Sequence, residues 1–278
     1  MIRTVSRVVP GRPTTEGAGV NLTRVLGMPE LGYLDPFLLL DEFKSDNPDD
    51  YIAGFPSHPH RGFETVTYLL NGRFRHRDSR GNEGLLTPGS VQWMTAGRGI
   101  IHSEMPEIEE GLLWGFQLWV NLPREKKLSE PRYQDIPGDE IPEVTDDGLR
   151  VRVISGEYAG ETGPAQTHIP IQYLDAHLQG SAGFTQKLSS DMTCFCYVYE
   201  GEAAFGASPD SHTAKAGDLV ILEQGDTVQV SAPGEGAFLF LAATPLKEPV
   251  VRAGPFVMNT EGELRQAFLD YQNGILDR

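Results

Sequence analysis

The sequence contains little cysteine. Only two occur in 278 residues, Cys194 and Cys196, both within the segment TCFCYVY. Side chains at positions i and i+2 of a strand share a face, so a disulfide between them would be badly strained. We therefore expect two buried strand thiols, which alone would make a poor metal site.

Long hydrophobic runs are also lacking. The longest is about AFLFLAA, residues 237–243, whereas a helix needs about 20 apolar residues to cross a bilayer. The first residues, MIRTVSRVVPGRPTTEG, lack the apolar centre of a secretory signal. These features predict a soluble, cytoplasmic protein without a membrane partner.

Positive charge is scarce relative to negative charge. The chain has 23 Lys and Arg against 39 Asp and Glu, a formal net charge of −16. Such a protein repels a phosphate backbone, so we expect no direct binding to nucleic acid.

What the chain has in abundance is short strand-like segments. Val-, Phe- and Tyr-rich runs are separated by turn residues, and the totals of 31 Gly and 20 Pro suit many tight turns. The pattern predicts an all-β protein of sandwich or barrel type. A weak repeat, TPGSVQWMTAGRG at 87–99 and KAGDLVILEQGDT at 215–227, favours two similar halves.

Residues 122–148, LPREKKLSEPRYQDIPGDEIPEVTDDG, are charged and poor in periodicity. This composition predicts a linker between two domains, at residues 1–121 and 149–250, with a final segment at residues 251–278. The final segment contains the clearest helix signal. Thr260 and Glu263 have capping-box spacing, and Gly274 can end the helix. We expect its apolar stripe to pack on a domain, the stripe being Leu264, Ala267, Phe268 and Tyr271.

Two short motifs carry metal-binding side chains at strand spacing. His58 and His60 open the segment HPHRGFETVTYLLNG, and His102 and Glu104 lie in RGIIHSEMP. Because each pair is two residues apart, both members point to one face. Side by side, the two segments would form a cage of three imidazoles and one carboxylate. The remaining four of the seven histidines are interpreted as surface or structural residues: His76, His168, His177 and His212.

The chemistry of this cage limits the metal. Imidazole and carboxylate without thiolate suit Fe(II), Mn(II), Ni(II), Cu(II) or Zn(II), and four ligands leave open positions on a six-coordinate ion. Pro56 precedes the histidines and Pro59 lies between them, and both stiffen the backbone that would hold the two rings.

Long motifs of the chain resemble the pirin family of the cupin superfamily. They are GFPSHPHRGFETVTYLLNG, WMTAGRGIIHSEMP, QLWVNLP and GPFVMNTEGELRQAFLDYQNG. The resemblance runs from about residue 34 to the last residues. It implies a bicupin: two antiparallel β-barrel domains face to face, with a short C-terminal helix. It also implies one metal, iron(II) first, in the N-terminal barrel, bound by His58, His60, His102 and Glu104.

Two positions depart from the general cupin pattern. Glu64 stands where other cupins carry a carboxylate ligand, and by strand alternation it would share a face with His60, so it is kept as the alternative to Glu104. In the second half, Val228 occupies the place of a histidine. We therefore expect the C-terminal barrel to bind no metal.

The resemblance implies two classes of function. The first is a quercetin 2,3-dioxygenase, which opens a flavonol ring with O₂ and releases carbon monoxide, with Glu104 as ligand and general base. The second is an iron-dependent, redox-sensing regulator that acts through a protein partner. An oxygenase of another enolic substrate also fits. Apolar residues near the ligands favour a flat aromatic substrate: Phe55, Phe63, Trp93, Met94, Phe116 and Trp119.

Overall fold

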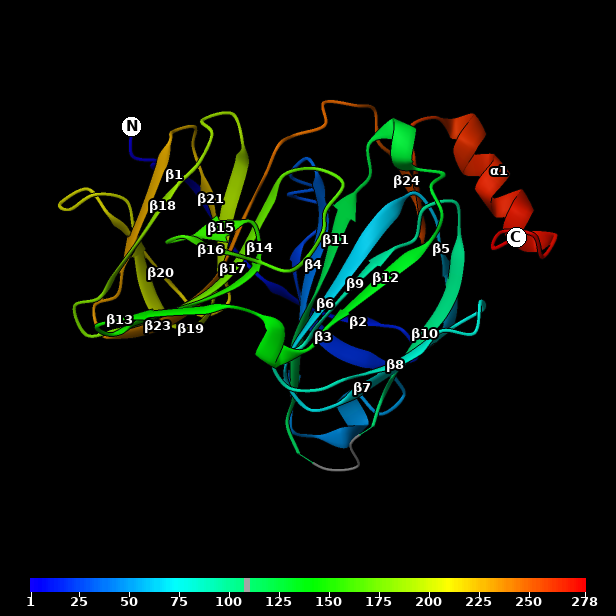
Figure 1. The fold of residues 1–278 in the computed structure, drawn as a ribbon, viewed down its shortest axis with the longest axis horizontal. Helices are drawn as coiled ribbons and strands as arrows, with labels where there is room; N and C mark the ends of the chain where they lie inside the picture. The colour runs from blue at the N-terminus through cyan, green and yellow to red at the C-terminus, as the bar shows by residue number, and fades with distance from the viewer. Residues whose placement is uncertain (108–110) are drawn as a thin grey trace. The chain divides into compact units, whose positions relative to one another are not determined.

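The chain folds mostly into β-sheets, as Figure 1 shows for the computed structural model, which describes residues 1–107 and 111–278. The predicted all-β fold is confirmed, and the described residues contain one α-helix, α1 (Glu261–Gln272). The sheets are open rather than closed into barrels. Within the described part of the chain, no helix is long and apolar enough to cross a membrane.

Two compact units divide the chain, and each takes in a terminal segment from the other end of the sequence. The first unit comprises residues 13–139 and 246–278, and the second comprises residues 1–12 and 140–245. The predicted boundaries at 121, 148 and 250 assign residues 1–12 to the N-terminal domain, whereas these residues belong to the second unit. The supposed linker contains strands of both units. Its β12 (Arg132–Ile136) pairs with β9 (Val91–Thr95), and its β13 (Glu143–Asp146) pairs with β14 (Leu149–Ser155).

The first unit contains two large antiparallel sheets, besides a separate two-stranded pair in its C-terminal segment. The smaller has four strands in the order β5 (Phe55–His60), β10 (Ile100–Pro106), β7 (Phe74–Asp78) and β8 (Glu83–Leu86). The larger has seven strands in the order β12, β9 (Val91–Thr95), β6 (Phe63–Asn71), β11 (Leu113–Asn121), β4 (Phe37–Ser45), β3 (Val20–Leu26) and β2 (Arg12–Glu16). Three short 3₁₀ turns accompany the strands: η1 (Pro48–Asp50), η2 (Arg124–Lys126) and η3 (Gly138–Glu140).

The second unit is built on one ten-stranded sheet. Its main path is β1 (Val5–Pro10), β21 (Asp218–Leu222), β19 (Thr193–Phe205), β23 (Glu235–Ala243), β17 (Ile171–Gln179), β14 (Leu149–Ser155) and β13. Off this path lie β18 (Gly183–Lys187), β20 (His212–Lys215) and β22 (Thr227–Ser231), and a separate pair is formed by β15 (Glu157–Tyr158) and β16 (Glu161–Thr162).

The interior of the second unit is filled by apolar side chains. Phe184, Phe238 and Phe240 pack there, and Val228 is buried among them. Cys194 and Cys196 belong to the same core as free thiols. Burial raises the pKa of Cys194 to about 12, so the thiol stays protonated at neutral pH. The absence of a metal from this unit stays a prediction.

A buried arginine fixes the N-terminal segment to the second unit. Arg3 is only 1% exposed, and its guanidinium donates hydrogen bonds to backbone carbonyls of Gly225, Met192 and Ser189 at 2.8–3.0 Å. Five donors in a rigid fork suit such a ring of carbonyls. This contact explains why residues 1–12 belong to a unit whose other members begin at residue 140.

The C-terminal segment packs on the first unit through β24 (Val251–Ala253), β25 (Phe256–Met258) and α1. The capping box of Thr260 and Glu263 is formed as predicted. Of the predicted stripe, Leu264 and Ala267 are buried, but Phe268 and Tyr271 are 36% and 40% exposed. Both rings pack against Phe256, with ring centres 4.9 and 6.3 Å away. The expectation that the whole stripe docks is therefore wrong for these two aromatic residues, because α1 lies over a small two-stranded ladder.

Candidate metal centre

The three predicted histidines come together where β5 pairs with β10. His58 lies directly opposite His102 in the antiparallel ladder, and His60 is opposite Ile100. The three ring centroids are 4.5–5.0 Å apart, and one ring nitrogen from each histidine lies within 4.8 Å of the other two. Among the described residues, this is the one group of three or more metal-competent side chains that is so compact.

The orientation of His58 and His60 suits a common cation. His58 Nδ1 lies 2.8 Å from the Pro56 carbonyl oxygen, and this hydrogen bond places the proton on Nδ1 and leaves Nε2 with a lone pair. The Nε2 atoms of His58 and His60 are 3.0 Å apart. Two nitrogens bound at about 2.1 Å with a right angle between them would lie about 3.0 Å apart, so the spacing fits adjacent ligands of one ion.

His102 supplies a second sign that the group is suited to a cation. Both of its ring nitrogens are buried and have no hydrogen-bond partner among the described residues. Unpaired buried polar atoms are costly, and ligation would satisfy one of them. Burial, followed by the neighbouring histidines, lowers the pKa values of His60 and His102 well below the ordinary value. Both rings are thus neutral at pH 7, the form that binds metals.

Glu104 lies beside the histidines but is not part of the three-nitrogen group. A bulge between His102 and Glu104 shifts the register of the ladder by one residue. Glu104 is therefore opposite Phe55, whereas an unbroken register would place it opposite Pro56. Its carboxylate accepts a hydrogen bond from the Thr67 hydroxyl at 3.0 Å. Burial raises the pKa of Glu104, and the neighbouring His58 ring and the Thr67 hydrogen bond partly oppose this. Metal ligation by Glu104 stays a prediction.

Thr67 connects Glu104 to Gln117 on the next strand. The Thr67 hydroxyl oxygen is 2.6 Å from the side-chain oxygen position of Gln117. A hydroxyl has one proton, so it cannot donate to both neighbours. With the amide turned over, Gln117 donates to Thr67 and Thr67 donates to Glu104, which satisfies all three groups. This chain of hydrogen bonds fixes the carboxylate against β6 and β11.

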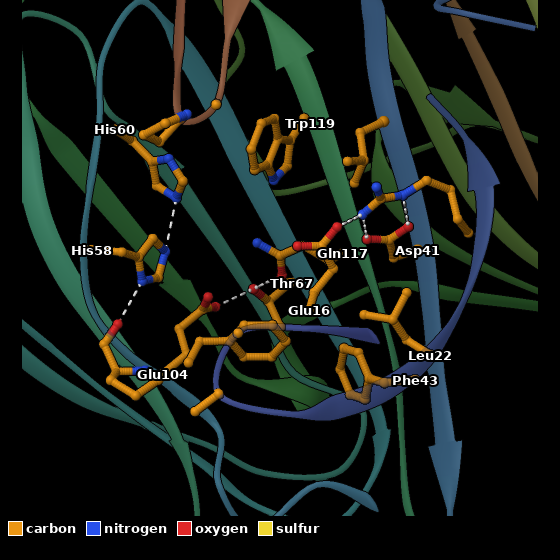
Figure 2. A pocket seen from close by; sticks show the side chains of 18 of the residues that line it. Glu16, Leu22, Asp41, Phe43, His58, His60, Thr67, Glu104, Gln117 and Trp119 are labelled. Atoms are coloured by element: carbon orange, nitrogen blue, oxygen red, sulfur yellow. Dashed lines mark hydrogen bonds and ion pairs between the residues drawn. The ribbon is translucent and has the colours of Figure 1, made fainter. Parts of the chain in front are cut away.

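A cavity of about 590 Å³ lies between the two sheets of the first unit, and His58, His60 and Glu104 open into it. Figure 2 shows the two histidines on one side and Asp41 with Phe43 on the other. Apolar side chains make up much of the wall: Leu22, Leu39, Phe43, Phe55, Phe74 and Trp119. A planar ligand of moderate size fits a cavity of this volume and lining.

The far side of the cavity contains a group of charges. Arg24 forms two hydrogen bonds with Asp41, at 2.9 and 2.8 Å, and an ion pair with Glu16 at 2.9 Å. Arg252 also lines the cavity, with its guanidinium carbon 4.7 Å from the ring centre of Trp119.

Comparison with known proteins agrees with this geometry. The family model for pirin matches residues 19–120, and the model for the pirin C-terminal cupin domain matches residues 173–277. The chain belongs to the pirin family. A pirin-like protein of Caulobacter vibrioides is 49% identical over 98% of this chain and 99% of its own length. Human pirin is 45% identical over 97% of this chain and 92% of its own.

A solved structure gives the same result for the fold. A quercetin 2,3-dioxygenase from Acinetobacter baumannii superposes with a TM-score of 0.92 and 34% identity, covering 99% of both chains. The resemblance to the pirin family drawn from the motifs is therefore confirmed. The first unit of this pirin family member has a cupin-type fold and contains a three-histidine centre suited to a divalent metal.

Glu64, the alternative carboxylate, faces away from this centre. β5 ends at His60 and β6 begins at Phe63, so the strand alternation expected from His60 to Glu64 is broken. Gly62 makes the break with φ +88°, and a Cβ there would lie 2.0 Å from the Val257 carbonyl oxygen. On β6 the odd-numbered Thr67 lines the cavity, which puts Glu64 on the opposite face, where it accepts a hydrogen bond from Thr95.

Other residues near the centre were missed or misjudged in the sequence. Trp93, Met94 and Phe116 are fully buried and do not line the cavity, whereas Phe55 and Trp119 do. Phe63 packs against both His60 and Trp119.

Of the two interpretations of His76, surface or structural, the structure fits the second, since His76 is only 1% exposed and lies opposite Glu104 in the β7–β10 ladder. It stacks on Tyr133 and lies 3.4 Å from Asp135. Gly84 leaves room for this pair, because a Cβ there would lie 2.1 Å from His76 Nε2. Only the strand pairing shows that His76 is a neighbour of Glu104.

The C-terminal segment supports the strand that carries the histidines. Arg61, next to His60, binds Asp270 of α1 at 2.6 Å and the Leu276 carbonyl at 3.3 Å. Lys127 is 2% exposed and donates to the carbonyl oxygens of Gly62 and Val257 at 2.8 and 2.9 Å. Residues 251–278 are thus a structural part of the unit that contains the candidate metal centre.

Proposed function

We propose that this pirin family member is a metal-dependent dioxygenase of the quercetin 2,3-dioxygenase type, which opens a flavonol ring with O₂ and releases carbon monoxide. His58, His60, His102 and Glu104 are the proposed metal ligands, and Glu104 is also the proposed general base. Iron(II) is the proposed metal, with manganese, nickel, copper or zinc as alternatives that the same ligands suit.

One observation carries the proposal: three imidazoles converge at the edge of a cavity whose walls are largely aromatic and aliphatic. A metal with a purely structural role is usually closed off by protein ligands, whereas a catalytic metal keeps open positions toward substrate. The Acinetobacter baumannii structure that covers 99% of this chain is named quercetin 2,3-dioxygenase, and this name supports the same choice.

When bound, the metal would supply Lewis acidity toward a phenolic oxygen and a redox-active centre for O₂. The side chains of the protein bind and orient the substrate. Trp119, with Phe55 and Phe43, offers apolar contacts to a flat ring system. The largely apolar walls lower the local dielectric constant, which strengthens electrostatic interactions beside them.

Glu104 is suited to take the proton of an enolic or phenolic hydroxyl. It is the one carboxylate among the proposed ligands, and it opens into the cavity beside His58. The hydrogen bond from Thr67 occupies one carboxylate oxygen, Oε1, and fixes the orientation of the group. The other oxygen therefore remains for the substrate proton or the metal.

The activity is tested with protein that has been loaded with metal under anaerobic conditions. On addition of quercetin and air, it should consume O₂ and release carbon monoxide. Glu104→Gln keeps the shape and a neutral oxygen donor but removes the base, so turnover should fall by about 10²–10⁴-fold. Glu16→Gln, a carboxylate on the far side of the cavity, is the matched control for loss of one negative charge.

Two results would refute the enzyme. One is no carbon monoxide with any of the five metals, and the other is equal turnover by wild type and a metal-free His102→Ala variant. The alternative, an iron-dependent redox-sensing regulator, then becomes the better hypothesis. It requires a protein partner that binds the protein in only one oxidation state of the metal, which a pull-down with reduced and oxidised protein would detect.

A further inference from the structure

Two arginines line the cavity, and their surroundings differ. Arg24 is engaged by two carboxylates, since it binds Asp41 through two nitrogens and also pairs with Glu16. Arg252 has no carboxylate within ion-pair distance among the described residues. Its one hydrogen bond there is a long one, 3.3 Å, from Nη1 to the Leu38 carbonyl. Most of the guanidinium donors of Arg252 are thus available to a ligand.

The position of Arg252 is fixed by its contact with Trp119. The guanidinium carbon lies 4.7 Å from the centre of that ring, a cation–π distance. The His60 ring packs against Trp119 as well, with ring centres 5.2 Å apart. Trp119 therefore contacts both a proposed metal ligand, His60, and the guanidinium of Arg252.

Neighbouring charges do not neutralise this guanidinium by contact. Asp41 and Glu16 influence it at longer range, but both are bound to Arg24. Burial, followed by the charge of Arg24, lowers the pKa of Arg252. An arginine remains charged under any such shift, so the result is a cation that lacks a fixed anion beside an apolar cavity.

We propose that Arg252, stacked on Trp119, binds two coplanar oxygen acceptors on the part of the substrate that lies away from the histidines. Such a pair is a carboxylate or two neighbouring phenol oxygens, and a planar guanidinium binds it with two parallel hydrogen bonds. This inference rests on the proposed function, because it assumes a planar phenolic substrate beside the histidines. It identifies the substrate class as planar phenols that carry a carboxylate or a pair of neighbouring phenol oxygens on a pendant ring.

The test measures equilibrium binding of flavonol probes to metal-loaded protein without O₂. Quenching of tryptophan fluorescence reports the bound fraction. The probes are three flavonols that differ only in the pendant ring: unsubstituted, 3′,4′-dihydroxy (quercetin) and 4′-carboxy. Arg252→Met keeps the length and apolar stem but removes charge and donors. Arg265→Met, on the exposed side of α1, is the matched control.

Arg252→Met should weaken binding of the dihydroxy and carboxy probes by about 10–100-fold, the loss expected for charge-assisted hydrogen bonds. Binding of the unsubstituted flavonol should change by less than about threefold, because packing is kept. Arg252→Lys should retain part of the carboxylate affinity and lose the dihydroxy preference, since an ammonium has no planar fork. Arg265→Met should bind all three probes like wild type.

Equal weakening of all three probes by Arg252→Met would overturn the proposal, because Arg252 would then act only by supporting Trp119. Identical affinities in Arg252→Met and Arg265→Met would overturn it as well. The measurement does not depend on turnover. Suppose that no flavonol is consumed under O₂ but the binding ratios are as expected. The proposed dioxygenase activity is then refuted, while the proposed binding of paired oxygen acceptors by Arg252 stands.

Discussion

Thr67→Val tests whether the hydrogen-bond chain from Gln117 through Thr67 orients Glu104. Valine has nearly the same shape as threonine, so the change removes a hydroxyl from a buried site on β6 and little else. The lost bond joins a neutral donor to a carboxylate at 3.0 Å, an interaction typically worth about 1.5–3 kcal/mol. The Gln117 amide loses its partner at the same time.

If Glu104 is a metal ligand, the metal should be bound more weakly in this variant. Removing a group that orients a ligand usually costs about 10–100-fold in metal affinity or activity. The assay is competition for iron(II) with a chelator of known affinity, under anaerobic conditions. Thr65→Val is the matched control, because Thr65 is also buried on β6, two residues away on the same face. Equal metal affinity in the two valine variants would show that the chain does not hold Glu104 in place for the metal.

Two further predictions concern stability. Phe268→Ala should lower the free energy of unfolding by about 1–2 kcal/mol rather than the 3–5 kcal/mol of a fully buried ring, because Phe268 is 36% exposed; a loss above 3 kcal/mol in denaturant titrations would contradict the partial docking of α1. Burial lowers the pKa of Lys127 to about 8 from an ordinary 10.5, so the unfolded chain binds more protons between these values and wild-type stability should rise with pH across that window. Lys127→Met should lack this contribution, and parallel stability curves for the two proteins from pH 7 to pH 10 would refute the assignment.

The histidines could be found in the sequence because their signal is local. His58 with His60, and His102 with Glu104, are two residues apart, and alternation within a strand fixes their common face. Their meeting depends on the pairing of β5 with β10, which the sequence suggests only through the pirin resemblance. The error over Glu64 has the same origin, since alternation was carried across a break at Gly62 that depends on the distant Val257.

Residues that act through neighbours from other strands left no signal in the sequence. Thr67 and Gln117 are 50 positions apart and meet only because β6 pairs with β11. Arg252 reaches the cavity because the C-terminal segment returns to the first unit, an exchange that composition does not reveal. The helix stripe was correct in its period, but periodicity cannot tell how wide a partner surface is, so Phe268 and Tyr271 were expected to be buried.

The central claim, that the converging imidazoles bind a metal, is tested most directly by the metal-to-protein ratio of chelator-free protein after loading with iron(II) and desalting. Wild type and His212→Ala, which lacks an exposed histidine of the second unit, should each retain one metal ion per chain. His58→Ala and His102→Ala should retain little metal while their β-type circular dichroism stays unchanged. Full occupancy in both of these variants would contradict the assignment of the site.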